Sequence, residues 1–225
     1  MIKFDNVTKK FLLGTVALNN VSFEITDNEF LFLVGPSGAG KTTVIKLILR
    51  EILPSSGSIM IDDFDIASKN FSQTTVLRRN IGVVFQDFKI LSDKNIFENI
   101  ALGLKVMNSP LIEIKSKVKE ALQLVGLSKQ EEVFPVQLSA GELQRVAIAR
   151  AVVGERKIIL ADEPTGNLDP KTAWEIMRVF KKLEGQRTIV IATHNTDIVN
   201  SFKKRVIALK EGKIIKDQRK GGYEI

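Results

Sequence analysis

Apolar and polar residues follow two different periods along this chain, and each period predicts a different element of secondary structure. Alternation at every second residue, or a short continuous apolar run, is typical of a β-strand. Apolar residues spaced three and four apart are typical of a helix with one buried face. These patterns predict strands at residues 2–7, 21–25, 30–34, 58–61, 81–85, 157–161, 187–192, 205–209 and 213–216. They predict helices at residues 43–52, 96–104, 113–125, 142–153, 170–183 and 197–202.

The two kinds of element are distributed unevenly over the 225 residues. Strands and helices alternate up to about residue 86 and again from about residue 157, whereas the stretch between them is mostly helical. Alternation of this kind is typical of an α/β fold. We therefore predict a single α/β domain, with a core formed by about 1–86 and 157–225 and a helical subdomain inserted at about 87–156.

A glycine-rich segment connects the predicted strand at 30–34 to the predicted helix at 43–52. It fits the pattern G-x-x-x-x-G-K-[ST] with the residues Gly35, Pro36, Ser37, Gly38, Ala39, Gly40, Lys41 and Thr42. Glycines let the backbone curl so that consecutive N–H groups point at phosphate oxygens, and the helix beginning near Thr43 adds partial positive charge. Lys41 can then reach the β- and γ-phosphates, while the Thr42 hydroxyl is placed to ligate Mg²⁺. The segment predicts a nucleotide-binding site.

Two adjacent acids, Asp162 and Glu163, end an apolar strand later in the chain. The carboxyl ends of strands in open α/β sheets face the ligand. Because neighbouring side chains on a strand point in different directions, two roles are possible: Asp162 supports Mg²⁺, and Glu163 orients or deprotonates an attacking water. The guanine-reading tetrapeptide Asn-Lys-x-Asp is absent from the sequence, which argues against a GTPase.

Composition narrows the chemistry further. The chain has no cysteine and one histidine, so thiol chemistry and multi-histidine metal cages are excluded, and any imidazole step must use His194. Its 33 Lys and Arg against 26 Asp and Glu leave a net charge of +7, which suits nucleic acid, an anionic membrane, a phosphate-rich ligand or simply a solubilising surface. With neither a signal-peptide pattern nor an apolar run of about 18 residues, we expect a soluble protein of a reducing compartment.

Further motifs resemble those of ABC ATPases. The segment 138–145 resembles the ABC signature, Gln86 the Q-loop glutamine, the segment 166–169 the D-loop, and His194 the switch histidine. With the phosphate-binding segment, they occur in the family's order and span the chain. This resemblance implies a P-loop nucleotide-binding domain with a mixed-sheet core, an antiparallel β subdomain and an inserted helical subdomain.

The resemblance also implies a head-to-tail homodimer around two ATP and Mg²⁺, in which each signature completes the partner's site. It assigns ATP contacts to Ser139, Gly141 and Glu142, and a stacking role on adenine to Phe11. It assigns catalytic roles to Lys41, Gln86, Glu163, Asp169 and His194, and Mg²⁺ contacts to Thr42, Gln86 and Asp162.

Three of these positions also have simpler interpretations. Ser139 and Glu142 can form a capping box at a helix start, which is compatible with a phosphate role. Phe11 can be a core residue of a strand. Ala140 and Glu142 depart from the usual signature, in which glycine and glutamine stand; alanine requires an ordinary backbone there, and glutamate is favourable only if it turns back to its own helix.

Within the family, the chain is similar to cell-division ATPases that act through a membrane subunit on cell-wall (peptidoglycan) hydrolases outside the membrane. We expect a cytoplasmic protein held at the inner face of the plasma membrane by that partner. The nearer alternative is the ATPase of a lipoprotein-release or export transporter. A nucleic-acid-associated ABC protein is a different class, but such proteins usually carry two cassettes or a long coiled coil, so no nucleic acid is expected. Residues 88–91 are candidates for the partner surface, or pack inside the insertion.

Overall fold

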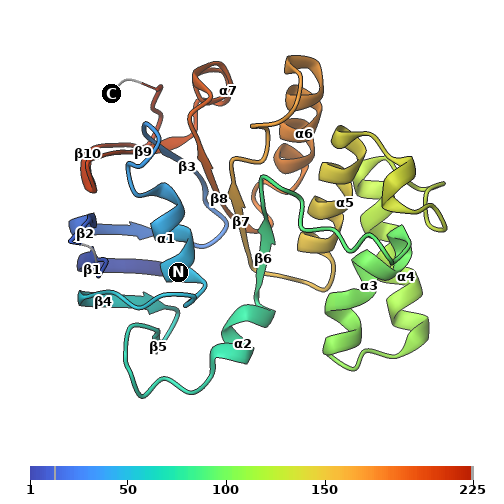
Figure 1. Cartoon of the computed structure of the whole chain (residues 1–225), viewed down its shortest axis with the longest axis horizontal. Coiled ribbons are helices and arrows are strands. Elements are labelled where there is room, and N and C mark those ends of the chain that lie inside the picture. The colour runs from blue at the N-terminus through green and yellow to red at the C-terminus, as the bar shows by residue number, and fades with distance from the viewer. Residues whose placement is uncertain (13, 224–225) are drawn as a thin grey trace.

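Two β-sheets organise the protein in the computed structural model, which describes residues 1–12 and 14–223 (Figure 1). The smaller sheet has the order β2-β1-β4-β5, and its neighbouring strands are antiparallel. Its strands are β1 (Ile2–Lys10), β2 (Val16–Ile25), β4 (Ser56–Ile61) and β5 (Phe64–Asp65). Along β1 the side chains of Ile2, Phe4 and Val7 are buried, and a register shift between Phe4 and Val7 interrupts the alternation of buried and exposed residues.

The larger sheet has the order β10-β9-β3-β8-β7-β6. Its strands are β3 (Phe30–Val34), β6 (Ile81–Val84), β7 (Ile158–Asp162), β8 (Thr188–Thr193), β9 (Arg205–Lys210) and β10 (Lys213–Gln218). All pairs are parallel except β9–β10, so the sheet is mixed. Val34 pairs with Thr193, and Asp162 with Ala192, which places the ends of β3, β7 and β8 at one edge.

Helices cover the larger sheet and extend to one side of it (Figure 1). They are α1 (Lys41–Ile48), α2 (Thr74–Arg79), α3 (Ile96–Val106), α4 (Leu111–Val125), α5 (Ala140–Val152), α6 (Pro170–Lys182) and α7 (Thr196–Phe202). Helices α3, α4 and α5 pack on one another, and α5 also packs on β6 and α6. One hydrophobic cluster joins these helices to one face of the larger sheet, and a second joins α1 and the smaller sheet to its other face.

The mixed sheet and the antiparallel sheet confirm the predicted architecture. The helix predicted at 43–52 is shorter at its end, because α1 stops at Ile48 and the chain turns at Arg50 with a left-handed φ of 50°. Sequence patterning missed β5 and α2, since each is short and α2 buries only Leu77. The division of the chain near residues 86 and 156 stays a prediction. Within the described residues, no helix combines the length and apolar character needed to cross a bilayer.

Candidate functional site

A cavity of about 630 Å³ opens at the edge where β3, β7 and β8 end. Parallel strands direct their carboxyl ends to this edge, which is where open α/β sheets bind ligands. The cavity brings together residues from distant parts of the chain. Its lining consists of Pro36, Ser37, Gly38, Ala39, Gly40, Lys41, Thr42, Thr43, Gln86, Glu163, His194, Thr196 and Tyr223.

The glycine-rich loop is shaped by close backbone approaches that only glycine permits. Gly35 has φ 152°, and a Cβ there would lie 2.3 Å from the carbonyl oxygen of Leu209. Gly40 has φ 108°, and a Cβ there would lie 2.6 Å from the carbonyl oxygen of Ala17. The loop therefore curls tightly against β9 and β2, as the sequence pattern predicts.

Lys41 carries its ammonium group into this loop. Its Nζ donates to the carbonyl oxygens of Gly35, at 2.7 Å, and Pro36, at 3.1 Å, and the side chain is buried. Gly40, the N-cap of α1, supplies no side-chain acceptor to the N–H groups of the first turn. Because the start of α1 lines the cavity, its N–H groups and partial positive charge are available to an anion.

Glu163 lies between a lysine and a histidine. Its Oε1 is 2.8 Å from Nδ1 of His194 and 3.7 Å from Nζ of Lys41. The backbone N–H of His194 also donates to Oε2, at 3.4 Å. Glu163 has a left-handed φ of 48°, a conformation that costs a non-glycine residue roughly 1–2 kcal/mol. Such strain is typical of functional positions, and here it presents an oriented carboxylate that can accept a proton in the cavity.

Asp162 and Thr42 offer oxygen ligands beside this cavity. Burial is the main cause of the raised pKa of Asp162, and the Glu163 charge adds to it, while a hydrogen bond from Thr42 opposes it. Oδ1 of Asp162 is buried and has no hydrogen-bond partner among the described residues. Thr42, Gln86 and Asp162 share the lining of an adjoining hollow of about 380 Å³. Hard oxygen donors of this kind fit Mg²⁺, which takes its remaining ligands from phosphates and water.

Gln86 is also tied to the segment that resembles the D-loop. Its Nε2 donates to Oδ1 of Asn167 at 3.2 Å, and Nδ2 of Asn167 donates to the carbonyl oxygen of Gln86 at 3.4 Å. Gly166 permits this approach, since a Cβ there would lie 3.1 Å from Nε2 of Gln86. Two hydrogen bonds therefore hold Gln86 against the segment 166–169.

The predicted signature residues do not join this cavity. Ser139 caps α5 in a reciprocal capping box: its hydroxyl and backbone N–H donate to Oε2 of Glu142, at 2.7 and 2.9 Å, and these bonds lower the pKa of Glu142. Ala140 is helical, and Glu142 turns back to its own helix, so both departures from the usual signature are accommodated. A Cβ on Gly141 would lie 2.5 Å from Cγ2 of Thr172, which explains a glycine there by close packing on α6.

Asp169 and Phe11 also lie outside the lining of the cavity. Asp169 caps α6 by accepting from the backbone N–H of Thr172 at 3.1 Å, and hydrogen bonds from Thr172 lower its pKa. Phe11 is 42% exposed, and Nζ of Lys9 lies 5.3 Å from the centre of its ring. The interpretation of Phe11 as a core residue is therefore wrong, whereas its exposed ring face suits stacking.

Sequence reasoning missed three residues of the site. Thr196 and Tyr223 line the cavity, and Asn167 holds Gln86. Thr196 stands next to the switch-histidine motif, and Asn167 lies within the segment 166–169 without having been given a role, so their position in the sequence was a usable signal. Tyr223 carries no such signal, because it follows the last strand by five residues and belongs to no motif.

Comparison with known proteins defines the class. The ABC transporter family matches residues 18–166. The protein superposes on the dimeric structure of MJ0796, a bacterial ABC transporter cassette, with a TM-score of 0.88 and 36% sequence identity. The superposition covers 99% of this chain and 100% of the MJ0796 chain. The same cassette was also solved with ADP and Pi after hydrolysis. The chain belongs to the ABC transporter family, and it is an ATP hydrolase with the predicted nucleotide-binding-domain fold.

Curated relatives specify the type of cassette. The chain is 47% identical to the cell division ATP-binding protein FtsE of Bacillus subtilis, over 99% of this chain and 98% of that protein. It is 45% identical to FtsE of Streptococcus pneumoniae, over 99% of this chain and 97% of that protein. The predicted similarity to cell-division ATPases is thereby confirmed, and the protein is an ABC ATPase of the FtsE type.

Proposed function

We propose that this chain hydrolyses ATP at the cavity beside β3 and uses the reaction to move a membrane partner during cell division. The observation that carries the proposal is the position of Glu163, whose carboxylate is held by His194 at 2.8 Å in the lining of the phosphate loop. A carboxylate so placed suits a base for water rather than a passive surface charge.

In the proposed reaction, the loop 35–42 and the N-terminus of α1 bind the β- and γ-phosphates of ATP. Glu163 orients a water and accepts its proton as the water oxygen attacks the terminal phosphorus. The bond from that phosphorus to the bridging oxygen then breaks, which yields ADP and phosphate. Lys41 stabilises the negative charge on the transferred group, and His194 keeps Glu163 in position. Mg²⁺, held by Thr42, Asp162 and Gln86, supplies charge neutralisation when bound.

We propose that two copies complete each other's sites. Ser139 and the start of α5 do not line the cavity of their own chain, yet a helix start carries N–H groups and partial positive charge that suit a phosphate. In a head-to-tail dimer, Ser139, Gly141 and Glu142 of one copy would face the terminal phosphate in the other, with Asp169 at the contact. The dimeric state of the related MJ0796 cassette supports this arrangement.

The Glu163→Gln variant tests the catalytic proposal. The amide keeps the size of the side chain but cannot accept the proton, so we expect ATP binding to remain, turnover to fall by at least 100-fold, and an ATP-bound dimer to accumulate. Turnover is measured by phosphate release and the dimer by size-exclusion chromatography with ATP. Glu24→Gln, on the exposed side of β2, is the matched control and should leave both unchanged. Normal hydrolysis by Glu163→Gln would refute the role of Glu163.

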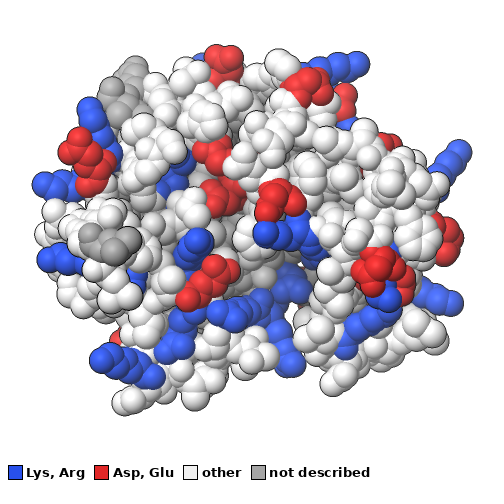
Figure 2. Space-filling model, viewed as in Figure 1, with Lys and Arg blue, Asp and Glu red and all other residues white. Residues whose placement is uncertain are grey.

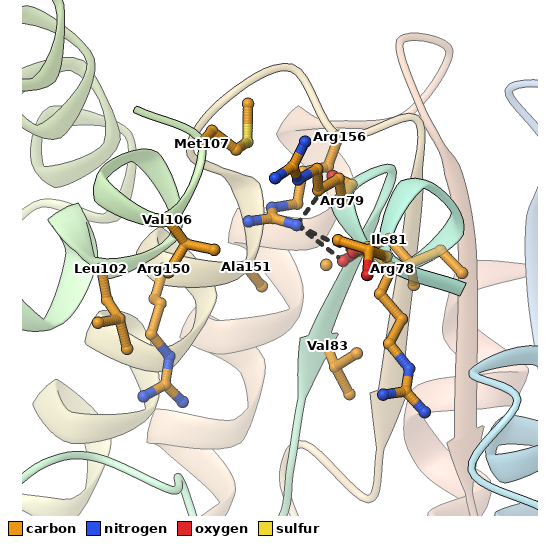
Figure 3. Close-up of a pocket in the computed structure, with 13 residues that line it drawn as sticks. Arg78, Arg79, Ile81, Val83, Leu102, Val106, Met107, Arg150, Ala151 and Arg156 are labelled. Atoms are coloured by element: carbon orange, nitrogen blue, oxygen red, sulfur yellow. Dashed lines mark hydrogen bonds between the residues drawn. The ribbon is translucent and has the colours of Figure 1, made fainter. Parts of the chain in front are cut away.

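A groove on another part of the surface suits a membrane subunit. It has a volume of about 390 Å³ and lies between α2 and β6 on one side and α3 and α5 on the other (Figure 3). Leu102, Val106 and Met107 make part of its wall apolar. Figure 2 shows Lys and Arg side chains gathered around a hollow in the lower part of that view, between the two sides of the molecule.

Four arginines line this groove, namely Arg78, Arg79, Arg150 and Arg156. None of them pairs with a carboxylate among the described residues; Arg156 instead donates to the carbonyl oxygens of Arg78, Arg79 and Ile81 (Figure 3). Burial lowers the pKa of Arg150 and Arg156, because their charge is poorly solvated. An apolar helix face with acidic neighbours would satisfy both features.

We therefore place a cytoplasmic helix of an FtsX-like membrane subunit in this groove, which would hold the chain at the inner face of the plasma membrane. Through it, ATP turnover would regulate peptidoglycan hydrolases outside the membrane. Residues 88–91 contribute less apolar surface than expected, because Phe88 and Ile90 pack on the core and only Lys89 and Leu91 are exposed. The alternative remains a lipoprotein-release or export complex.

Co-purification with tagged FtsX, compared with a multi-span permease, separates these alternatives. Arg79→Glu reverses one charge in the groove. The Arg79 side chain makes no hydrogen bond to another described residue; only its backbone carbonyl oxygen accepts one, from Arg156. We expect it to reduce recovery with FtsX severalfold while the ATPase activity of the isolated chain is unchanged. Lys129→Glu, an exposed charge reversal outside the groove, is the control. Equal recovery of both variants would remove the groove from the proposal.

A further inference from the structure

The end of the described chain returns to the nucleotide cavity. After β10, the backbone folds back so that Tyr223 joins the lining of the cavity beside the phosphate loop. Glu163 and His194 belong to the same lining. The only tyrosine of the protein is thus placed among the groups that act on the terminal phosphate.

Specific contacts hold this segment in place. The backbone N–H of Tyr223 donates to Oδ1 of Asn200 on α7 at 2.7 Å, and that of Gly221 donates to the carbonyl oxygen of Lys204 at 3.1 Å. A Cβ on Gly222 would lie 2.7 Å from Oδ1 of Asn200, so a larger residue there would displace the anchor. The ring of Tyr223 also packs against the large hydrophobic cluster.

The hydroxyl of Tyr223 is suited to donate a hydrogen bond to phosphate. Burial raises the pKa of Tyr223, and the negative charge of Glu163 raises it further. Both causes disfavour the tyrosinate, so the hydroxyl stays protonated at neutral pH. The neutral hydroxyl can donate a hydrogen bond to a phosphate without forming an ion pair with Glu163. A cationic side chain at the same position would form that ion pair.

We propose that Tyr223 donates to the terminal phosphate of bound ATP, so that the C-terminal segment distinguishes ATP from ADP. The inference rests on the proposed function, because it requires a triphosphate in this cavity. Tyr223 shares the lining with Glu163 and His194, where the terminal phosphate reacts, whereas Phe11, the candidate adenine contact, does not line the cavity. Asn200 acts as a positioning residue through its bond to the Tyr223 backbone.

The test compares the binding of two nucleotides by the chain of residues 1–225. Isothermal titration with the non-hydrolysable β,γ-imido analogue of ATP and with ADP, each with excess Mg²⁺, gives both affinities. Tyr223→Phe keeps the ring and loses only the hydroxyl, so we expect affinity for the triphosphate to fall about 2- to 12-fold while affinity for ADP is unchanged. Asn200→Ala should shift the ratio of affinities in the same direction. Ser201→Ala, at an exposed position of α7, is the control.

Three results would overturn the proposal. In the first, Tyr223→Phe has the wild-type ratio of affinities, or weakens both nucleotides equally, as a purely structural tail would. In the second, the ratio changes only at high protein concentration, which assigns the effect to the dimer contact rather than to phosphate. In the third, the wild-type chain binds neither nucleotide. Only this result would also refute the proposed function, so the two failures can be told apart.

Discussion

Replacing His194 by alanine removes the only imidazole of the protein and the 2.8 Å bond between its Nδ1 and Oε1 of Glu163. Hydrogen bonds to charged groups contribute about 1.5–3 kcal/mol. If that contribution holds Glu163 in its reactive orientation, its loss lowers kcat on the order of 10- to 150-fold, because about 1.4 kcal/mol corresponds to a factor of ten. The His194 side chain is 65% exposed, so solvent replaces part of the lost bond and the Tm should fall by no more than a few degrees.

Steady-state phosphate release gives kcat, and equilibrium titration with ATP and Mg²⁺ gives the affinity, which should stay within a few-fold of wild type. His194→Gln provides a second comparison, since its amide can still donate to Glu163 and should restore part of the rate. Wild-type turnover by His194→Ala would refute the positioning role. A variant that loses ATP binding in proportion to kcat would equally contradict it, since the effect would then lie in binding rather than in the orientation of the base.

Two other substitutions probe the cradle and the metal ligand. Gly35→Ala should abolish ATP binding in the same titration, because the new Cβ would lie 2.3 Å from the Leu209 carbonyl oxygen. Gly185→Ala is the control, since Gly185 also has a left-handed φ but a Cβ there would have no neighbouring atom within 4 Å. Asp162→Asn should raise the Tm at pH 7 but abolish Mg²⁺-dependent turnover. Burial is the main cause of the raised pKa of Asp162, so above that pKa the charged carboxylate destabilises the folded chain. The difference in Tm between Asp162→Asn and the wild type should therefore shrink as the pH falls through the pKa of Asp162. An unchanged or lower Tm would contradict this reasoning.

Much of the site could be predicted because its chemistry lies in contiguous residues. The loop 35–42 is shaped by its own glycines, and the strand 158–162 carries Asp162 and Glu163 to the edge of the sheet. Such features depend on local backbone geometry, which the order of residues specifies directly. The short helix α2 escaped prediction for the opposite reason, since a single buried residue leaves no periodic pattern.

The sequence by itself determined the phosphate cradle, the paired acids and the alternation of strands and helices, because these follow from neighbours along the chain. Only the tertiary structure decided that Lys41, Glu163 and His194 meet, since the pairing of β3, β7 and β8 brings their ends to one edge. It also kept Ser139 out of its own cavity and brought Tyr223 into it. Those placements depend on packing between residues far apart in the chain. Local sequence patterns carry no information about such contacts.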